Sequence, residues 1–346
     1  MAVAASRALR GQPPQQEPTY SSETRVVNVL ATVRTKHGEI VKNLTKQDFS
    51  LAEEGRPQVI RYFAQESDLP LTLGLLVDTS GSQRRLIGEE VSATRTFLDQ
   101  VLRDKDQGFL IHFDHEAELL QDVTPSRPLL QRALQDIGQP TLQRGGGGYP
   151  GGGGGGYPGG GGGRRNGGGG GGGGGTVLYD AVLLSADELM SHQKGRKALI
   201  VLTDGVDQGS KVTLSRAIEA AQRSDSMVYA LMFEDKDAYN GGPRFGGMGG
   251  GRHGGGGGGR FPQQEHADGR KVMQQMARET GGGYFEVSKK TSLAQVYAQV
   301  EEELRNQYSL GYTPDSAANG GYRRIQLTTA KKDLVVQARD GYFADK

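Results

Sequence analysis

The sequence predicts an α/β fold: a doubly wound, mostly parallel sheet with helices on both faces, joined to a small β unit formed by the two ends of the chain. The runs 71–77 and 197–202 are apolar on both faces, which is typical of strands buried inside a parallel sheet. Between residues 70 and 308, strand patterns alternate with amphipathic helix patterns, as in folds of this class. The flanking segments 24–66 and 309–345 carry short strand and turn patterns instead, so we expect them to form the β unit.

Composition excludes several classes of protein. The 346 residues suffice for one large domain and a small one, and the net charge of +1 provides no basic surface for nucleic acid or anionic lipid. No apolar run approaches the roughly 18 residues that span a bilayer. Cysteine is absent, which excludes disulfides and thiolate metal sites. We therefore expect no nucleic-acid partner and no membrane span.

Glycine is concentrated in two tracts. Of the 56 glycines, 37 lie in the segments 145–175 and 241–259, which we expect to be flexible loop insertions in the large domain. We interpret both tracts as low-complexity expansions, because glycine has no side chain to pack and loses the most entropy on ordering. The first tract ends directly before Thr176, which suggests the hypothesis that it modulates access to a site there.

The amino-terminal segment 1–22 is polar and contains several proline and glutamine residues, which predicts a disordered leader. Its first seven residues lack the continuous apolar core of about 7 to 15 residues that a secretory signal needs. The sequence therefore predicts no complete signal peptide in this segment.

The β unit is predicted from both ends of the chain. Alternating apolar residues predict a strand at 27–33, and two further strands, 48–52 and 59–63, form a predicted hairpin through the connection 53–57. A second predicted hairpin covers 322–338. Isolated hairpins are marginally stable in water, so we expect the two ends to pair with each other.

The large domain contains six predicted strands and six predicted helices in alternation. Apolar residues at helical spacing identify each helix, and continuous apolar runs identify most strands. The third strand is expected at the edge of the sheet. The strands are predicted at 71–77, 109–113, 118–123, 197–202, 227–233 and 284–287, and the helices at 87–101, 129–137, 177–190, 213–223, 266–279 and 293–304.

The first predicted strand of the large domain ends in a cluster of oxygen-bearing side chains. Asp78, Ser80 and Ser82 follow it at a spacing of two, so an extended turn would project all three to one side. Gly81 allows the backbone to curl so that they converge. Converging oxygen ligands suit a hard cation such as Mg²⁺. Taken alone, however, this stretch is also compatible with an ordinary polar turn.

Two more stretches agree with a metal site. Thr176 directly precedes a helical pattern, where it alone is most simply a helix N-cap, and Asp204 ends the second buried strand. In this order and spacing, the three stretches resemble the von Willebrand factor A domain and its metal-ion-dependent adhesion site. The resemblance extends over roughly 24–345 apart from the glycine tracts, and is strongest to bacterial proteins in which short β segments flank that Rossmann-like domain.

The resemblance implies a set of ligands and a mode of action. It implies hydroxyl ligands from Ser80, Ser82 and Thr176, and carboxylates of Asp78 and Asp204 that bind Mg²⁺ or Mn²⁺ directly or through water. At most two carboxylates balance the ion, so its remaining coordination position would accept an Asp or Glu carboxylate from a protein partner. The resemblance further implies a secreted or periplasmic adhesion module without catalysis.

Three other groups of polar residues lie outside this set of ligands. Asp180 lies one helical turn after Thr176, where it either supports the site from behind the ligands or is solvated. We interpret Asp207 as an exposed loop acid rather than a second metal ligand. A cluster on and after the second strand resembles a metal site, but we interpret it as satisfied or exposed side chains: His112, Asp114, His115 and Glu116.

Two alternative functions remain open. One is a structural protein with a vestigial metal site. The other is a Mg²⁺-dependent hydrolase of the phosphotransferase type, which would need a second acid two residues after Asp78 as the general acid or base. Ser80 occupies that position, and its hydroxyl has no useful pKa for this role. The sequence therefore favours a metal-dependent protein-binding module over an enzyme.

Overall fold

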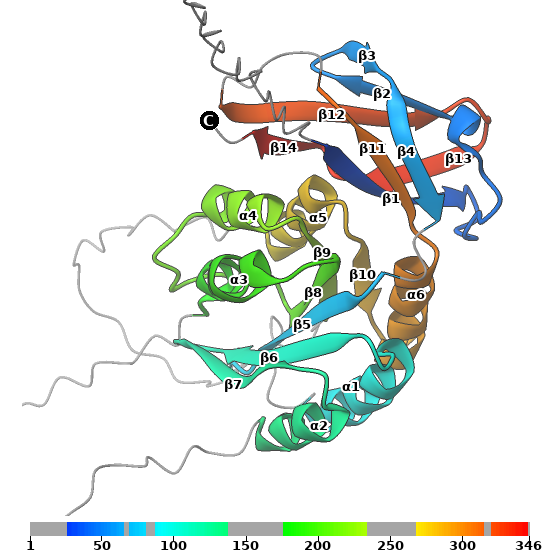
Figure 1. The fold of residues 1–346 in the computed structure, drawn as a ribbon. Helices are drawn as coiled ribbons and strands as arrows, with labels where there is room; N and C mark the ends of the chain where they lie inside the picture. The colour runs from blue at the N-terminus through cyan, green and yellow to red at the C-terminus, as the bar shows by residue number, and fades with distance from the viewer. Residues whose placement is uncertain are drawn as a thin grey trace, which may run out of the picture.

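The computed structural model contains a six-stranded sheet between two layers of helices, with two four-stranded antiparallel sheets beside it (Figure 1). The predicted leader 1–22, both glycine tracts, Gly81 and Ser82 lie outside the residues that the structure describes. The described residues are 26–65, 69–80, 87–137, 176–233, 268–314 and 320–344.

The central sheet has the strand order β10-β9-β8-β5-β6-β7. Every neighbouring pair is parallel except β6 and β7, which are antiparallel. The doubly wound, mostly parallel sheet predicted from the sequence is confirmed, and the third strand lies at its edge as expected. The strands are β5 (Leu71–Asp78), β6 (Gln107–Phe113), β7 (Ala117–Thr124), β8 (Arg196–Thr203), β9 (Ser226–Phe233) and β10 (Tyr284–Val287).

Helices cover both faces of this sheet. One face carries α1 (Ile87–Val101), α2 (Arg127–Asp136) and α6 (Leu293–Arg305), and the other carries α3 (Leu178–Leu184), α4 (Leu214–Arg223) and α5 (Gly269–Thr280) (Figure 1). After α3 the chain continues as a π-helical turn, Ser185–Leu189, followed by a 3-10 turn, Met190–His192. The helix predicted at 177–190 is therefore irregular in its second half. Among the described residues, no helix is both long enough and apolar enough to cross a membrane.

The two cores follow from the pleat of the buried strands. Along β5, Leu75 and Val77 point into the core beneath α1 and α6, whereas Leu76 points into the core beneath α3 and α5. Gly74 leaves room for a neighbouring ring, because a Cβ at this position would lie 2.3 Å from Cζ of Phe109. Because successive β5 side chains enter two different cores, this strand has to be apolar on both faces.

The two antiparallel sheets each combine strands from both ends of the chain, which confirms the predicted β unit. One sheet has the order β13-β1-β11-β4 and the other β14-β12-β2-β3. On the side facing the central sheet, α4 packs against β14 and α5 against β13 (Figure 1). The elements are β1 (Val27–Thr35), a short turn of helix (Lys46–Asp48), β2 (Phe49–Glu53), β3 (Arg56–Gln58), β4 (Ile60–Gln65), β11 (Tyr308–Tyr312), β12 (Gly321–Thr329), β13 (Leu334–Ala338) and β14 (Gly341–Ala344).

Both predicted hairpins paired the wrong strands. β2 pairs with β3 through the tight turn Glu54 and Gly55, whose φ angles of +50° and +76° are typical of a two-residue hairpin connection. The strand predicted at 59–63 corresponds to β4, which pairs with β11 in the other sheet. Within 322–338, β12 pairs with β2 and β14, whereas β13 pairs with β1. An alternating pattern identifies a strand but contains no information about its partner.

A buried carboxylate ties the two antiparallel sheets together. Glu53 of β2 is 4% exposed, and its Oε1 accepts a hydrogen bond from Nη1 of Arg323 at 2.7 Å. Its Oε2 accepts from the hydroxyl of Tyr312 at 2.5 Å and from that of Tyr342 at 3.1 Å. Burial, and then the hydrogen bond to Glu53, raise the pKa of Tyr312 above its usual range. Residues from β2, β11, β12 and β14 thus share one charged cluster.

Replacing Glu53 should strongly destabilise the β unit. Glu53→Ala leaves the buried guanidinium of Arg323 without its carboxylate, and loss of one partner of a buried ion pair costs about 3 kcal/mol or more. Urea denaturation followed by circular dichroism measures the change. Glu39→Ala, which removes an exposed carboxylate in the turn after β1, is the control and should change stability by less than about 0.5 kcal/mol. Equal stabilities of the two variants would contradict this role.

Candidate metal site

The candidate site lies where the chain changes direction across the central sheet. After β5 the chain continues through α1 on one face of the sheet, whereas after β8 it continues through α4 on the other face (Figure 1). β5 and β8 are neighbours, with Val77 opposite Leu202. Loops therefore diverge at the carboxyl ends of these two strands, and this is where open α/β sheets bind ligands. Asp78 ends β5, and Asp204 follows β8 directly.

Asp78 is almost completely buried and hydrogen-bonded on both carboxylate oxygens. Its side chain is 1% exposed. Oδ1 accepts a hydrogen bond from the backbone amide of Ser80 at 2.9 Å, and Oδ2 accepts from the hydroxyl of Thr203 at 2.6 Å. The same hydroxyl accepts from the amide of Gly205 at 3.1 Å. Thr203 therefore connects Asp78 to the turn that carries Asp204.

Sequence analysis did not identify Thr203 as part of the site. Its side chain is fully buried at the end of a strand whose other residues are mostly apolar. One feature of the sequence could have pointed to Thr203: its hydroxyl lies between the apolar run of β8 and the Asp204-Gly205 pair.

Two carboxylates influence each other at this site. Burial raises the pKa of Asp78 to about 6, hydrogen bonds from Ser80 and Thr203 oppose this rise, and the negative charge of Asp204 adds to it. The site is thus a buried position where negative charge is costly.

Thr176 is held beside the loop that follows β8. It is 7% exposed, and its carbonyl accepts hydrogen bonds from the amides of Gln208 at 3.0 Å and Gly209 at 3.2 Å. The next residue, Val177, donates its amide to the carbonyl of Asp114 at 2.9 Å. Val177 is also the N-cap residue of α3, without a side-chain cap, so the interpretation of Thr176 as a helix N-cap is wrong.

Asp180 and Asp207 fasten the same two segments together. The Asp180 carboxylate accepts the backbone amides of Lys211 at 3.0 Å and Val212 at 3.1 Å. Asp207 accepts the amide of Tyr179 at 3.3 Å and the hydroxyl of Ser210 at 2.6 Å. The interpretation of Asp207 as an exposed loop acid is wrong, because it is half-buried and anchors the start of α3. Asp180 is half-buried and bonded to the backbone of the next loop, and its support of a metal from behind the ligands stays a prediction.

The predicted site residues are thus placed as follows. Ser80 is half-buried, and its backbone amide donates a hydrogen bond to Asp78. The charge of Asp204 is close enough to Asp78 to raise its pKa. Thr176 lies against the loop that begins at Asp204. Ser82 lies outside the described residues, so its position stays a prediction.

The His112 cluster has local partners. Nδ1 of His112 lies 3.2 Å from the hydroxyl of Thr79, and Nε2 lies 3.1 Å from Oε2 of Glu118. Asp114 accepts the amides of His115 at 2.5 Å and Glu116 at 3.4 Å, which shapes the turn after β6. Among the described residues, no three or more His, Cys, Asp or Glu side chains gather in an arrangement that could hold a metal.

No model of a protein family and no curated protein sequence matches this chain. Among solved structures, it is similar to a von Willebrand factor type A protein from Catenulispora acidiphila, with a TM-score of 0.46 and 10% identity over 92% of this chain and 73% of that one. A second similar structure is an aerotolerance-related membrane protein from Bacteroides fragilis, with a TM-score of 0.42 and 16% identity over 68% of this chain and 98% of that one.

A third similar structure is proximal thread matrix protein 1 from the mussel byssus, described with zinc in its metal-ion-dependent adhesion site. Its TM-score is 0.45, with 10% identity over 74% of this chain and 50% of that one. All three structures share little sequence with this chain, so the similarity is one of fold alone. A function for this chain must be argued from the residues of its own site.

The buried carboxylate of Asp78 predicts an unusual pH dependence in the presence of EDTA. Because its pKa is raised from 3.8 to about 6, the folded chain binds an extra proton between these pH values, and stability falls as the pH rises through them. A shift of about two units corresponds to roughly 3 kcal/mol. Asp78→Asn, which is neutral throughout, should remove this fall. Urea titrations from about pH 4 to about pH 7 measure it; parallel curves for the two proteins would contradict the prediction.

Proposed function

We propose that this protein is a non-catalytic module that binds a protein partner through a divalent cation. The residues that would hold the cation are Asp78, Ser80, Ser82, Thr176 and Asp204. The observation that carries the proposal is the buried carboxylate of Asp78, which is surrounded by hydroxyl and amide donors and faces the charge of a second carboxylate.

The donor set fits a hard divalent cation. A cation next to Asp78 and Asp204 would offset both the cost of burying the first carboxylate and its repulsion by the second. All proposed ligand atoms are oxygens, which suit Mg²⁺ or Mn²⁺ better than a metal that prefers sulfur or nitrogen. Ser82 belongs to the set on the grounds of its spacing after Asp78.

The cation would supply an electrophilic position for a ligand from outside the chain. Only two of the five proposed ligands carry a charge, so the bound ion would keep an affinity for another anionic oxygen. An Asp or Glu side chain of a protein partner matches this position in charge and in hardness. The role of this chain is to hold the loops so that their oxygens converge.

Binding is favoured over catalysis by the residue at position 80. A phosphotransferase-type hydrolase would need an acid there, whereas Ser80 places a hydroxyl and donates its amide to Asp78. A vestigial site in a structural protein is separated from the proposed function by measuring whether the metal binds.

Metal binding should be saturable and should depend on Asp78. We expect isothermal titration of Mg²⁺ or Mn²⁺ into EDTA-treated, dialysed protein to show one site, and Asp78→Asn to abolish the heat, because the variant loses one of the two charged ligands. Asp136→Asn, an exposed carboxylate at the end of α2, is the matched control and should bind as the unaltered protein does. Equal heats for both variants, or no heat in any protein, would overturn the proposed function.

If the metal binds, partner recognition should require it together with an acidic side chain. A library of displayed peptides, selected with Mg²⁺, should yield sequences with an essential Asp or Glu whose binding is lost in EDTA. Selected peptides that bind equally well in EDTA would contradict the bridging role of the cation.

Asp180 should affect metal binding without contacting the metal. Asp180→Asn weakens the anchor of Lys211 and Val212, which holds the loop after Asp204 against α3, so we expect Mg²⁺ affinity to fall by about 10- to 100-fold. The matched control is Asp187→Asn, because Asp187 follows the same helix but pairs with Arg216 at the surface, at 3.6 Å. An unchanged affinity in Asp180→Asn would show that this anchor does not position the site.

A further inference from the structure

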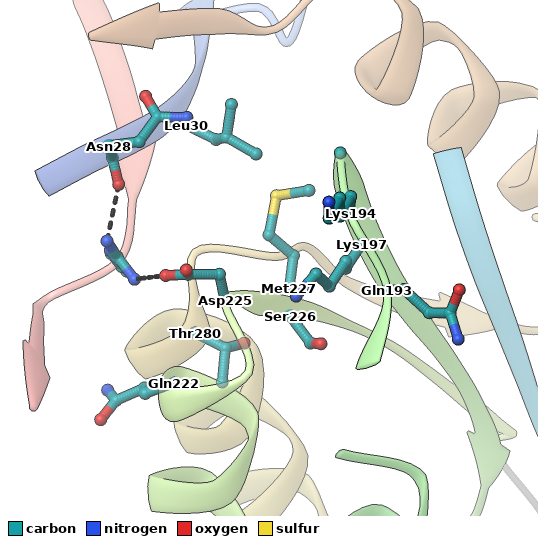
Figure 2. Close-up of a pocket in the computed structure, with 12 residues that line it drawn as sticks. Asn28, Leu30, Gln193, Lys194, Lys197, Gln222, Asp225, Ser226, Met227 and Thr280 are labelled. Atoms are coloured by element: carbon teal, nitrogen blue, oxygen red, sulfur yellow. Dashed lines mark hydrogen bonds and ion pairs between the residues drawn. The ribbon is translucent and has the colours of Figure 1, made fainter. Parts of the chain in front are cut away.

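A cavity lies between the antiparallel sheets and the amino-terminal ends of β8 and β9 (Figure 2). Its volume is about 310 Å³, and Asn28, Leu30 and Arg339 of the β unit line it together with residues of the central sheet and its helices. The candidate metal site lies at the carboxyl ends of the same parallel strands, so the cavity is at the opposite edge of the sheet.

Two cations begin strand β8, and the structure uses them differently. The guanidinium of Arg196 donates to the carbonyl of Leu69 at 3.1 Å and to the carbonyl of Leu304, so it joins β8 to the preceding loop and to α6. The ammonium of Lys197, in contrast, lines the cavity and donates to the carbonyl of Ser224 at 2.8 Å. Within the described ranges this is its only hydrogen bond, although an ammonium has three donors.

Lys197 is buried, and no carboxylate of the described segments pairs with it. Lys197 is 8% exposed, and a lysine is rarely this buried without a paired acid. Burial lowers the pKa of Lys197, and the charge of Asp225 opposes this shift. The Asp225 carboxylate, however, is paired with Nη1 of Arg339 at 2.6 Å, and Figure 2 shows Asp225 at one side of the cavity. Among the residues that the structure describes, the ammonium therefore lacks a direct anionic partner.

The remaining walls combine one more cation with apolar groups. Lys194 is exposed and also lines the cavity, whereas Leu30 and Met227 contribute apolar surface (Figure 2). Other polar groups in the wall are already used: the amide of Gln222 donates to the carbonyl of Glu279 at 2.7 Å, and the hydroxyl of Thr280 donates to the carbonyl of Met276 at 2.8 Å. The ammonium groups of the two lysines thus have hydrogen-bond donors available to a ligand, and Nε of Arg339 in the same wall is also without a hydrogen-bond partner among the described residues.

We propose that this cavity binds a small organic anion with an apolar tail, such as a short-chain carboxylate. The carboxylate would lie between Lys197 and Lys194, and the tail against Leu30 and Met227. The volume is at the small end of the range for ligand cavities, about 300 to 1,000 Å³. Because its walls come from both the β unit and the central sheet, a bound anion would stabilise their packing.

Calorimetric titration of hexanoate tests the proposal, and EDTA in the buffer keeps the result independent of the metal site. We expect saturable binding with a dissociation constant below about 1 mM. Hexanamide, a neutral molecule of the same size, should give no saturable heat. Lys194→Gln should weaken hexanoate binding by about 5-fold or more, and the control Lys332→Gln, in the exposed turn between β12 and β13, should leave it unchanged.

Lys197→Met removes the central ammonium but also a buried hydrogen bond, so a second variant is needed in case it does not fold. Leu30→Trp narrows the cavity from the side of β1 without changing its charge, and it should abolish hexanoate binding while the circular dichroism spectrum stays that of the folded protein. The proposal is overturned by any of three results: no saturable hexanoate heat, equal binding of hexanamide, or unchanged hexanoate affinity in both Lys194→Gln and folded Leu30→Trp.

Discussion

The contact between the Thr203 hydroxyl and the buried Asp78 carboxylate determines how the carboxyl end of the central sheet is built. It joins the ends of β5 and β8, two strands that are neighbours in the sheet although their contact residues are 125 positions apart in the chain. Thr203 also accepts the amide of Gly205, so the turn bearing Asp204 is held by the same hydroxyl. Any ligand that reaches Asp78 therefore meets a preformed arrangement of oxygens at the point where the winding of the sheet reverses.

The loops around this contact are secured by backbone hydrogen bonds from several directions. The segment before α3 is bonded to the loop after β6 through Val177, and to the loop after β8 through Thr176. Asp180 and Asp207 strengthen the second connection. The proposed metal site depends on this redundancy, because ligands carried on loops need a second set of contacts to hold them.

The β unit is attached to the central domain by its own buried polar contacts. Glu303 of α6 is fully buried, and its carboxylate pairs with the guanidinium of Arg34 in β1. It also accepts a hydrogen bond from the side-chain amide of Gln337 in β13 at 3.2 Å. Because separation of the two parts would expose or unpair these groups, they are expected to stay together. The cavity lined by Lys197 lies along the same boundary, at the end of the sheet away from Asp78.

The sequence by itself determined most strands and helices of the central domain and the acidic and hydroxyl side chains at the end of β5. Apolar residues on both faces identified β5 and β8 as buried strands, because this pattern is local and short runs of it between turn residues are typical of such strands. The acids at the ends of these strands, Asp78 and Asp204, were visible for the same reason, whereas the role of the Thr203 hydroxyl was not. Only the tertiary structure decided which strands pair, as β12 and β13 illustrate by entering different sheets. It also decided that Thr203 binds Asp78, that Asp207 anchors α3, and that Lys197 faces a cavity. Each of these depends on a contact between residues distant in the chain, and a local pattern does not encode the partner.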